Sequence, residues 1–390
     1  MRIGIFCLVL GYVLSQFYRA FLAVMAPALE ADVGATAEQL ADASGLWFLA
    51  FAALQLPVGW ALDRTGPRRT AAVLLGLCGG GGALVFGLAQ APWQIMAGMA
   101  LIGAGCAPVL MASLYIFARV FPPAVFGTAA GVIIGVGSIG NLGAALPMAW
   151  AAETFGWRES VLALAAITFA TAAAILRFVP DPPRAGVSAG AGSFRGILAS
   201  RAIWLILPLM AVHAAPASGI RGLWVGPYFT DVFGADAAGV GQATLIMAVA
   251  MVAGAFAYGP LDRVFRTRKG VVLVGNLLCT AALMALWAAP GSGWWAAAAL
   301  IAAVGAFGAS FPMLMAHGRA LFPTHLVGRG VTLLNLFAIG GVGVAQVASG
   351  RVHGSVPGGG ADAYGLLFGF FGLILLAGCV IYAFAQDRRD

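Results

Sequence analysis

Charged residues are scarce in this 390-residue chain. Only 9% of its residues are Asp, Glu, Lys or Arg, whereas 62% are hydrophobic, and the mean hydropathy is +0.96. In soluble globular proteins about a quarter of the residues are charged. The composition therefore excludes an ordinary soluble protein and predicts an integral membrane protein.

Cysteine is also rare, and several catalytic motifs are missing. The 5 cysteines fall in apolar runs without the spacing of metal ligands, so neither a disulfide framework nor a metal site is predicted. The sequence has no P-loop, no His-Glu-x-x-His and no Gly-x-Ser-x-Gly. These absences argue against an ATP-driven pump and the commonest hydrolases, and we expect neither enzymatic activity nor a cofactor.

Long apolar segments fill most of the sequence. A helix that crosses a hydrocarbon core about 30 Å thick needs about 20 apolar residues, and this criterion predicts twelve spans. The first apolar run continues to Pro27, so it is interpreted as a helix and not as a cleaved signal peptide. The predicted spans cover residues 4–28, 39–61, 70–90, 93–118, 124–151, 159–179, 202–228, 240–261, 270–289, 294–317, 329–350 and 364–385.

Basic residues orient the spans. Of the 21 Lys and Arg, Arg158 and Arg351 fall in outer loops, Arg19 and Arg221 fall inside spans, and all others fall in inner loops if the N-terminus is cytoplasmic. This bias follows the positive-inside rule, so the net charge of +7 marks topology and does not indicate nucleic-acid binding. We expect a monomeric, multi-pass protein surrounded by the lipid of a bacterial inner membrane, with both termini cytoplasmic.

The two halves of the chain repeat each other. Asp32 precedes the pair Asp63-Arg64 by the same interval that separates Asp231 from Asp262-Arg263. Parallel repeats of this kind are typical of transporters built from two similar bundles. The predicted fold is an all-α membrane protein with twelve transmembrane helices in two pseudo-symmetric six-helix bundles, residues 1–180 and 201–390, joined by a cytoplasmic linker at 181–200.

One loop motif resembles that of a known family. Residues 59–69 read Gly-Trp-Ala-Leu-Asp-Arg-Thr-Gly-Pro-Arg-Arg, and residues 259–263 read Gly-Pro-Leu-Asp-Arg. The first segment resembles the signature Gly-x-x-x-Asp-Arg-x-Gly-x-Arg-Arg of the major facilitator superfamily, and the second lies where the family has a weaker copy. The resemblance implies a secondary transporter that works by alternating access, with a central substrate site between its two bundles.

The same resemblance implies a conformational latch at these two loops. Physically, Gly59 would let two helices approach closely, and the Asp63 carboxylate could accept hydrogen bonds at a neighbouring helix N-terminus. The alternative is a basic loop that only sets topology. The predicted latch residues are Gly59, Asp63, Arg64, Gly66, Arg68, Asp262 and Arg263.

Two departures from the family pattern bear on the substrate. The fourth span lacks the arginine that proton-coupled members carry near the position of Met99. The fifth span is rich in glycine, like the drug-antiporter signature, but has Asn141 where Gly-Pro is expected. Tight helix packing by small residues explains the same glycines. An alternative function therefore stays open, a proton-driven exporter of a neutral or hydrophobic compound.

Two arginines inside the spans favour an anionic substrate. A charge at bilayer depth costs about 2.5 to 3.5 kcal/mol by the lower estimates, and the 14 Asp and Glu are all assigned to loops. The planar guanidinium fork matches carboxylate and phosphate. We therefore predict that Arg19 and Arg221 bind a small organic or phosphorylated anion. The pair resembles the arginines of the superfamily's organophosphate:phosphate exchangers.

Polar and aromatic neighbours extend this predicted site. Tyr12 and Gln16 share a helical face with Arg19, and Trp224 lies near Arg221 along its span, so all three are predicted substrate contacts. With no carboxylate assigned to the membrane, His213 is the candidate proton site. Both exchange against a counter-anion and symport with protons stay open.

Overall fold

The described residues form α-helices and two short π-helical segments, without β-strands. The computed structural model describes residues 2–181, 201–322 and 327–387, and the side chains in these ranges except at positions 2, 123–128, 201, 262–263 and 327–329. Helices satisfy every backbone hydrogen bond internally, as a lipid environment requires. By internal contacts the chain divides into two compact units, Met1–Ser188 and Ala189–Asp390, each described by itself below. The predicted linker lies outside the described residues, except for Asp181.

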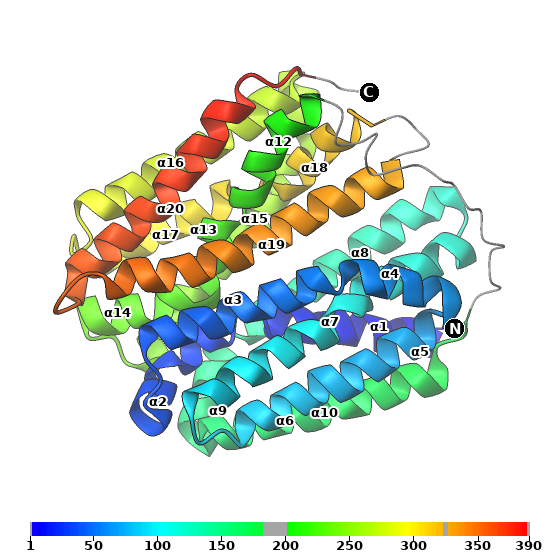
Figure 1. Ribbon diagram of the computed structural model, residues 1–390, viewed down its shortest axis with the longest axis horizontal. Helices are drawn as coiled ribbons and strands as arrows, with labels where there is room; N and C mark the ends of the chain where they lie inside the picture. The colour runs from blue at the N-terminus through cyan, green and yellow to red at the C-terminus, as the bar shows by residue number, and fades with distance from the viewer. Residues whose placement is uncertain (1, 182–200, 323–326, 388–390) are drawn as a thin grey trace. The chain divides into compact units, whose positions relative to one another are not determined.

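Unit 1 is a bundle in which three of the spans are bent (Figure 1). The pair α1–α2 bends by 54°, and the pairs α3–α4 and α8–α9 bend by 41°. Its elements are α1 (Arg2–Phe17), α2 (Leu22–Val33), α3 (Ala37–Ala53), α4 (Gln55–Arg64), α5 (Pro67–Leu74), η1 (Leu75–Gly80), α6 (Gly81–Gly87), α7 (Pro92–Val120), α8 (Pro123–Gly143), α9 (Leu146–Phe155) and α10 (Trp157–Phe178).

Unit 2 begins with a span assembled from four short elements. Its elements are α12 (Arg201–Val212), α13 (Ala215–Gly219), η2 (Ile220–Trp224), α14 (Val225–Phe233), α15 (Ala237–Phe265), α16 (Arg268–Ala288), α17 (Trp294–Phe307), α18 (Phe311–Arg319), α19 (Val327–Gly354) and α20 (Gly360–Tyr382). Pro208 lies inside α12 and Pro216 opens α13. Because proline has no N–H to donate, these residues interrupt the regular hydrogen-bond ladder of this span.

The predicted spans are confirmed in place, although some helices extend beyond the predicted ends. Within the described residues, nine continuous helical stretches are long and apolar enough to cross a membrane, or up to twelve spans if each of the three bent pairs counts as one. Each predicted span overlaps one of these. The predicted all-α fold class is thus confirmed.

The first two spans of each unit are joined by the same kind of turn. α2 ends at Gly34 and α14 ends at Gly234, both in the left-handed conformation, with φ of 69° and 65°. The next helices start at side-chain caps, because Thr36 accepts from the N–H of Gln39 and Asp236 accepts from the N–H of Gly239. The repeat seen in the sequence is therefore also a repeat of local geometry.

Glycines of the fifth span serve the packing of α1 against α8. A Cβ at Gly140 would overlap the carbonyl oxygen of Val13, and a Cβ at Gly137 would overlap the ring of Tyr12. At Gly135, one turn away, a Cβ would meet nothing within 4 Å. Close helix approach thus accounts for the glycines at 137 and 140, which removes the main reason for likening this span to a drug-antiporter signature.

The assignment of every acidic residue to a loop was wrong. Asp32 and Asp231 lie in the last turns of α2 and α14, and Asp42 lies more than one turn inside α3. Hydrophobic windows place span ends too far inward, because terminal helical turns that reach the interface carry charge. The carboxylates still lie toward the ends of their spans.

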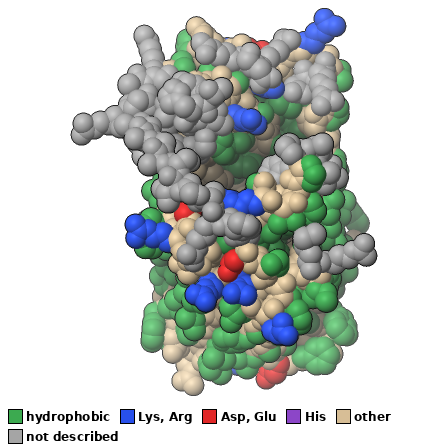
Figure 2. Space-filling view, turned by 90° about the vertical axis from the view of Figure 1, so that its right-hand side faces the viewer, with side chains coloured by type: hydrophobic (Ala, Val, Ile, Leu, Met, Phe, Trp, Pro, Cys, Tyr) green, Lys and Arg blue, Asp and Glu red, His purple; other side chains and the backbone are tan. Residues whose placement is uncertain are grey.

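Basic side chains gather at the ends of several helices. Figure 2 looks onto the right-hand side of Figure 1, where the turn between α4 and α5 lies, and shows more Lys and Arg than Asp and Glu on that face. Arg64 at the end of α4 and Arg69 in the first turn of α5 are exposed, as is Arg119 in the last turn of α7. All three arginines lie in segments that are assigned to inner loops from the sequence; their side of the membrane stays a prediction.

We predict that Gly140→Ala destabilises unit 1, because the new methyl group must displace the backbone of α1. Overpacking of this kind costs about 1 to 3 kcal/mol. The thermal unfolding midpoint of the purified protein in detergent measures the effect. Gly135→Ala on the same helix is the matched control and should leave the midpoint unchanged. Equal midpoints for both variants would show that α1 and α8 do not require this close approach.

Candidate functional site

Arg19 lies at the break in the first span. It falls in the turn between α1 and α2, where the helix axis bends by 54°. Its guanidinium carbon is 5.0 Å from the ring centroid of Trp47 and 5.0 Å from that of Phe51, both on α3. The two rings stack on each other with centroids 5.2 Å apart and an interplanar angle of 21°. The cation therefore rests on the faces of a pair of aromatic rings.

Several buried polar atoms surround this arginine. Nε of Arg19, Oε1 of Gln16 and Nε1 of Trp47 are inaccessible to solvent and have no hydrogen-bond partner among the described residues. No carboxylate of the described residues forms an ion pair with Arg19. Buried polar atoms are nearly always paired in native proteins, so this cluster is a candidate contact surface for a polar solute.

Tyr12 lies on the same side of α1 but is engaged in packing. Its side chain is 6% exposed, and its ring lies against α8 at Gly137. The structure therefore brings Tyr12, Gln16 and Arg19 into one region of unit 1. It adds Trp47 and Phe51, which helical spacing along the first span cannot predict.

Arg221 lies within the π-helical segment η2 and is 4% exposed. Short π-helical segments inside α-helices occur frequently at functional sites. Next to η2, Gly219 is in contact with Gln346 of α19, and a Cβ at this glycine would overlap the amide oxygen. Gln346 is fully buried, and neither of its amide atoms has a hydrogen-bond partner among the described residues. Gln346 therefore joins Arg221 as a candidate polar contact in unit 2.

Trp224 is part of the packing of unit 2. It is fully buried, its indole N–H donates to the Ser349 hydroxyl at 2.8 Å, and its ring lies 4.9 Å from that of His353. With its only donor occupied, Trp224 has no polar atom left for a substrate. Its position favours a structural role over the predicted substrate contact.

His213 is buried where the first span of unit 2 is interrupted. Its Nδ1 lies 2.9 Å from the carbonyl oxygen of Met210, and its ring stacks on Phe311 with centroids 5.8 Å apart. Because a carbonyl oxygen only accepts, Nδ1 carries the proton in this arrangement and Nε2 offers a lone pair. Nε2 has no hydrogen-bond partner among the described residues. The role of His213 in proton transfer stays a prediction.

The region of the predicted latch in unit 1 centres on Asp181, which the sequence pattern does not single out. The Asp181 carboxylate accepts from the backbone N–H of Arg68 at 3.0 Å and forms an ion pair with Nε of the same residue at 3.3 Å. Asp181 therefore caps the N-terminus of α5. Gly66 has φ of +95°, and a Cβ there would lie 2.9 Å from the Asp181 carboxylate, so glycine is required for two reasons.

Other predicted latch residues behave differently. Asp63 is exposed and forms no hydrogen bond or ion pair with any described residue, and the guanidinium of Arg64 lies 4.8 Å from the ring of Trp60. The expectation for Gly59 was wrong in this structure, since the nearest atom to a Cβ would be Met111 Cε at an ordinary 3.9 Å. The side chains of Asp262 and Arg263 lie outside the described residues.

Unit 2 repeats the cap at the start of its third span. Asp387, which follows α20 as Asp181 follows α10, accepts from the backbone N–H of Lys269 at 3.1 Å. Burial favours a higher pKa for Asp387, but hydrogen bonds from Thr267 and the Lys269 N–H outweigh it and hold the pKa below its usual value. The signal that could have revealed both residues is an acid a few positions after the sixth span of each half.

The architecture and these buried charges define a class, the polytopic membrane transporters with two repeated six-span units. Residues 8–225 match the sequence profile of the Major Facilitator Superfamily. The chain therefore belongs to the Major Facilitator Superfamily, whose members carry small molecules across membranes, and it is not expected to be an enzyme.

Solved transporters share the fold at low sequence identity. The chain is similar to a bacterial homologue of the human lysosomal transporter Spinster in an inward-facing, occupied conformation, with 20% identity, a TM-score of 0.76, and coverage of 98% of this chain and 96% of that one. It is also similar to a D-xylose-proton symporter, with 15% identity, a TM-score of 0.79, and coverage of 98% and 97%. These likenesses concern the fold alone.

The name of one curated relative includes a substrate. The chain is 24% identical over 183 residues to a protein of Cupriavidus necator named "Probable sulfoacetate transporter SauU". The match covers 47% of this chain and 42% of that protein. The chain thus spans less than half the length of this relative.

We predict that Asp181→Ala destabilises unit 1, because α5 loses its N-terminal cap and Arg68 loses its carboxylate. Loss of a helix cap costs about 0.5 to 2 kcal/mol. Thermal unfolding in detergent measures this loss. Asp63→Ala removes a carboxylate of the same loop that has no described partner, and it should leave the midpoint unchanged. A larger effect of Asp63→Ala would contradict the assignment of the cap to Asp181.

Proposed function

We propose that the protein is a secondary transporter of a small organic anion that works by alternating access. In this proposal it lies in a bacterial inner membrane with both termini cytoplasmic, and each unit contributes one arginine, Arg19 and Arg221, to substrate binding. Membership of the Major Facilitator Superfamily supports the transport function. The substrate class rests on the arginines.

The observation that carries the proposal is the environment of Arg19. Its guanidinium lies inside a membrane span at a helix break, on two aromatic rings and without a described carboxylate partner. Aromatic faces stabilise the positive charge but accept no strong hydrogen bonds. The planar N–H fork is therefore available to a carboxylate, sulfonate or phosphoryl group.

The name of the curated relative supports the same substrate class. Sulfoacetate is a small molecule that carries a carboxylate and a sulfonate, both of which guanidinium groups bind. The alternative, export of a neutral or hydrophobic compound, rested on the glycines of the fifth span. Packing of α1 on α8 accounts for the glycines at 137 and 140, so no specific observation now favours that alternative.

A thermal-shift screen of the purified protein tests the substrate class directly. The panel contains mono- and dicarboxylates, sulfonates, organophosphates and neutral drug-like compounds. A ligand that binds the folded protein stabilises it by RT ln(1 + [L]/Kd), so we expect shifts only with anions. Stabilisation by neutral compounds alone would overturn the proposal.

We predict that Arg19→Lys and Arg221→Lys each weaken anion binding on the order of tenfold or more, although both keep the positive charge. A lysine ammonium lacks the bidentate fork, and a hydrogen bond to a charged group contributes about 1.5 to 3 kcal/mol. Equilibrium binding to the purified protein measures the effect. Arg119→Lys, at an exposed position on α7, is the control and should bind normally. Wild-type binding by both site variants would rule out the two-arginine site.

We predict that Trp47→Phe weakens anion binding about tenfold, because it keeps a ring beneath Arg19 but removes the Nε1–H donor. That donor is buried and has no hydrogen-bond partner among the described residues. Phe51→Tyr, which keeps the second ring, is the control for changes in aromatic contact. Unchanged affinity in Trp47→Phe would show that Trp47 positions Arg19 and does not donate to the anion.

The coupling mode gives a further prediction. If the protein exchanges anions, liposomes loaded with unlabelled substrate should take up labelled substrate without a pH gradient, and His213→Gln should keep most of this activity. Glutamine retains hydrogen bonding but does not titrate near neutral pH. Uptake that needs an inward proton gradient and vanishes in His213→Gln would instead establish proton symport through this histidine.

A further inference from the structure

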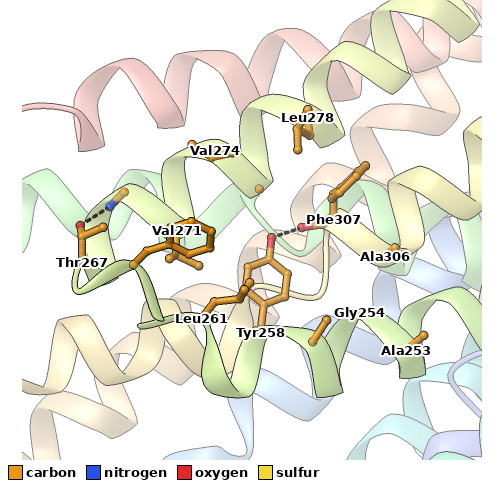
Figure 3. A pocket seen from close by; sticks show the side chains of 14 residues that line it. Ala253, Gly254, Tyr258, Leu261, Thr267, Val271, Val274, Leu278, Ala306 and Phe307 are labelled. Carbon is orange, nitrogen blue, oxygen red and sulfur yellow. Dashed lines mark hydrogen bonds between the residues drawn. The ribbon is translucent and has the colours of Figure 1, made fainter. Parts of the chain in front are cut away.

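Unit 2 contains a deep apolar groove between α15 and α16, separate from Arg221 and its neighbours. The groove encloses about 530 Å³, within the range of about 300 to 1,000 Å³ typical of ligand pockets. Ala253 and Tyr258 of α15 line one wall, and Val274 and Leu278 of α16 line the other (Figure 3). Ala257 of α15 also lines the groove. The end of α17 closes its floor at Ala306 and Phe307.

The groove offers no free polar side chain to a ligand. The Tyr258 hydroxyl donates to the carbonyl oxygen of Phe307 at 2.8 Å, and the Thr267 hydroxyl accepts from the N–H of Gly270 at 2.9 Å. Both interactions appear as dashed lines in Figure 3. The remaining lining residues are apolar or glycine. The part of a ligand that fills this groove must therefore be hydrocarbon.

The groove opens on the surface of the membrane-spanning part of unit 2. Phe265, Val274 and Leu278 at its edges are 63%, 58% and 44% exposed. Large apolar side chains exposed on a membrane-spanning helix are suited to contact with lipid tails. An acyl chain can enter such a groove sideways without crossing a polar barrier.

One end of the groove is formed by a basic turn. Thr267 and Gly270, which line the groove, belong to the turn that joins α15 to α16, and this turn carries Arg266, Arg268 and Lys269. Arg266 is exposed and is held in the left-handed conformation with φ of 52°. Asp387 is the acid that the described residues place at this turn, and its carboxylate accepts from the backbone N–H of Lys269. Among the described side chains of this turn, three cations stand against one carboxylate, so this described part of the turn is positive.

We propose that this groove binds an anionic phospholipid of the inner leaflet, with one acyl chain between α15 and α16 and the phosphate at Arg266 and Lys269. A neutral hydrophobic molecule would fill the groove but would bring no negative charge to the basic turn. A free phosphate would satisfy the turn but not the groove. Basic clusters at the cytoplasmic ends of membrane helices attract anionic headgroups, so only a lipid of this charge fits both ends.

Native mass spectrometry of the delipidated full-length protein tests whether an acyl chain occupies the groove. Wild-type protein should retain dioleoyl phosphatidylglycerol at least about tenfold better than dioleoyl phosphatidylcholine, and dihexanoyl phosphatidylglycerol should bind weakly because its chains are short. Ala257→Phe fills the groove and should abolish retention. Ala255→Phe, at an exposed position on the same helix that does not line the groove, is the matched control and should retain the lipid. Equal retention by both variants would overturn the proposal.

A double substitution of basic residues tests whether the turn binds the lipid headgroup. Arg266→Asn combined with Lys269→Gln should remove the preference for phosphatidylglycerol over phosphatidylcholine, and asparagine keeps the left-handed conformation at 266 accessible. The control combines Arg119→Gln with Arg177→Gln in unit 1, which removes the same net charge and should preserve the preference. Loss in both pairs would show a general charge effect and no site. Thermal unfolding checks that each variant is folded.

Discussion

A guanidinium inside a membrane must be stabilised by its surroundings, and the organisation of the first span of unit 1 follows from this constraint. The cost of the buried charge is about 2.5 to 3.5 kcal/mol by the lower estimates. A desolvated cation–π contact contributes about 2 kcal/mol, and Arg19 lies on two rings. The rings can thus hold the arginine in place when no anion is bound. A carrier needs this property, because its site must persist after the substrate leaves.

The sixth span of each unit is fastened at both of its ends by an acid. At the start of this span, Asp32 of α2 accepts from Trp157 at 3.1 Å and from Arg158 at 2.8 Å of α10, and Asp231 of α14 accepts from Tyr364 of α20. At the other end, Asp181 and Asp387 cap α5 and α16. Exposed pairs contribute little singly. Placed at both ends of one helix, they link the first, third and sixth spans within each unit.

Hydrophobicity predicts the spans, because it depends on the bilayer and not on packing detail, and the internal repeat predicts the two halves. The positions of Arg19 and Arg221 follow from the same reasoning. The rings of Trp47 and Phe51 could not be predicted, because they reach Arg19 only through the rotation of α3 about its axis. Helix rotation also explains why Trp224, close to Arg221 along the chain, is engaged by Ser349 in the packing of unit 2.

The two arginines occupy irregular backbone in both units, although different causes produce it. In unit 2, Pro208 and Pro216 interrupt the span ahead of the π-helical segment that holds Arg221. In unit 1, the break at residues 18–21 precedes Pro27 and contains Arg19. Non-helical backbone within a membrane is tolerated where it is buried in protein or lines a watery cavity, and broken helices hold the solute in many transporters. The irregular backbone at Arg19 and Arg221 is therefore compatible with the proposed two-arginine site, and under that proposal the first span of each unit is where substrate specificity should be sought.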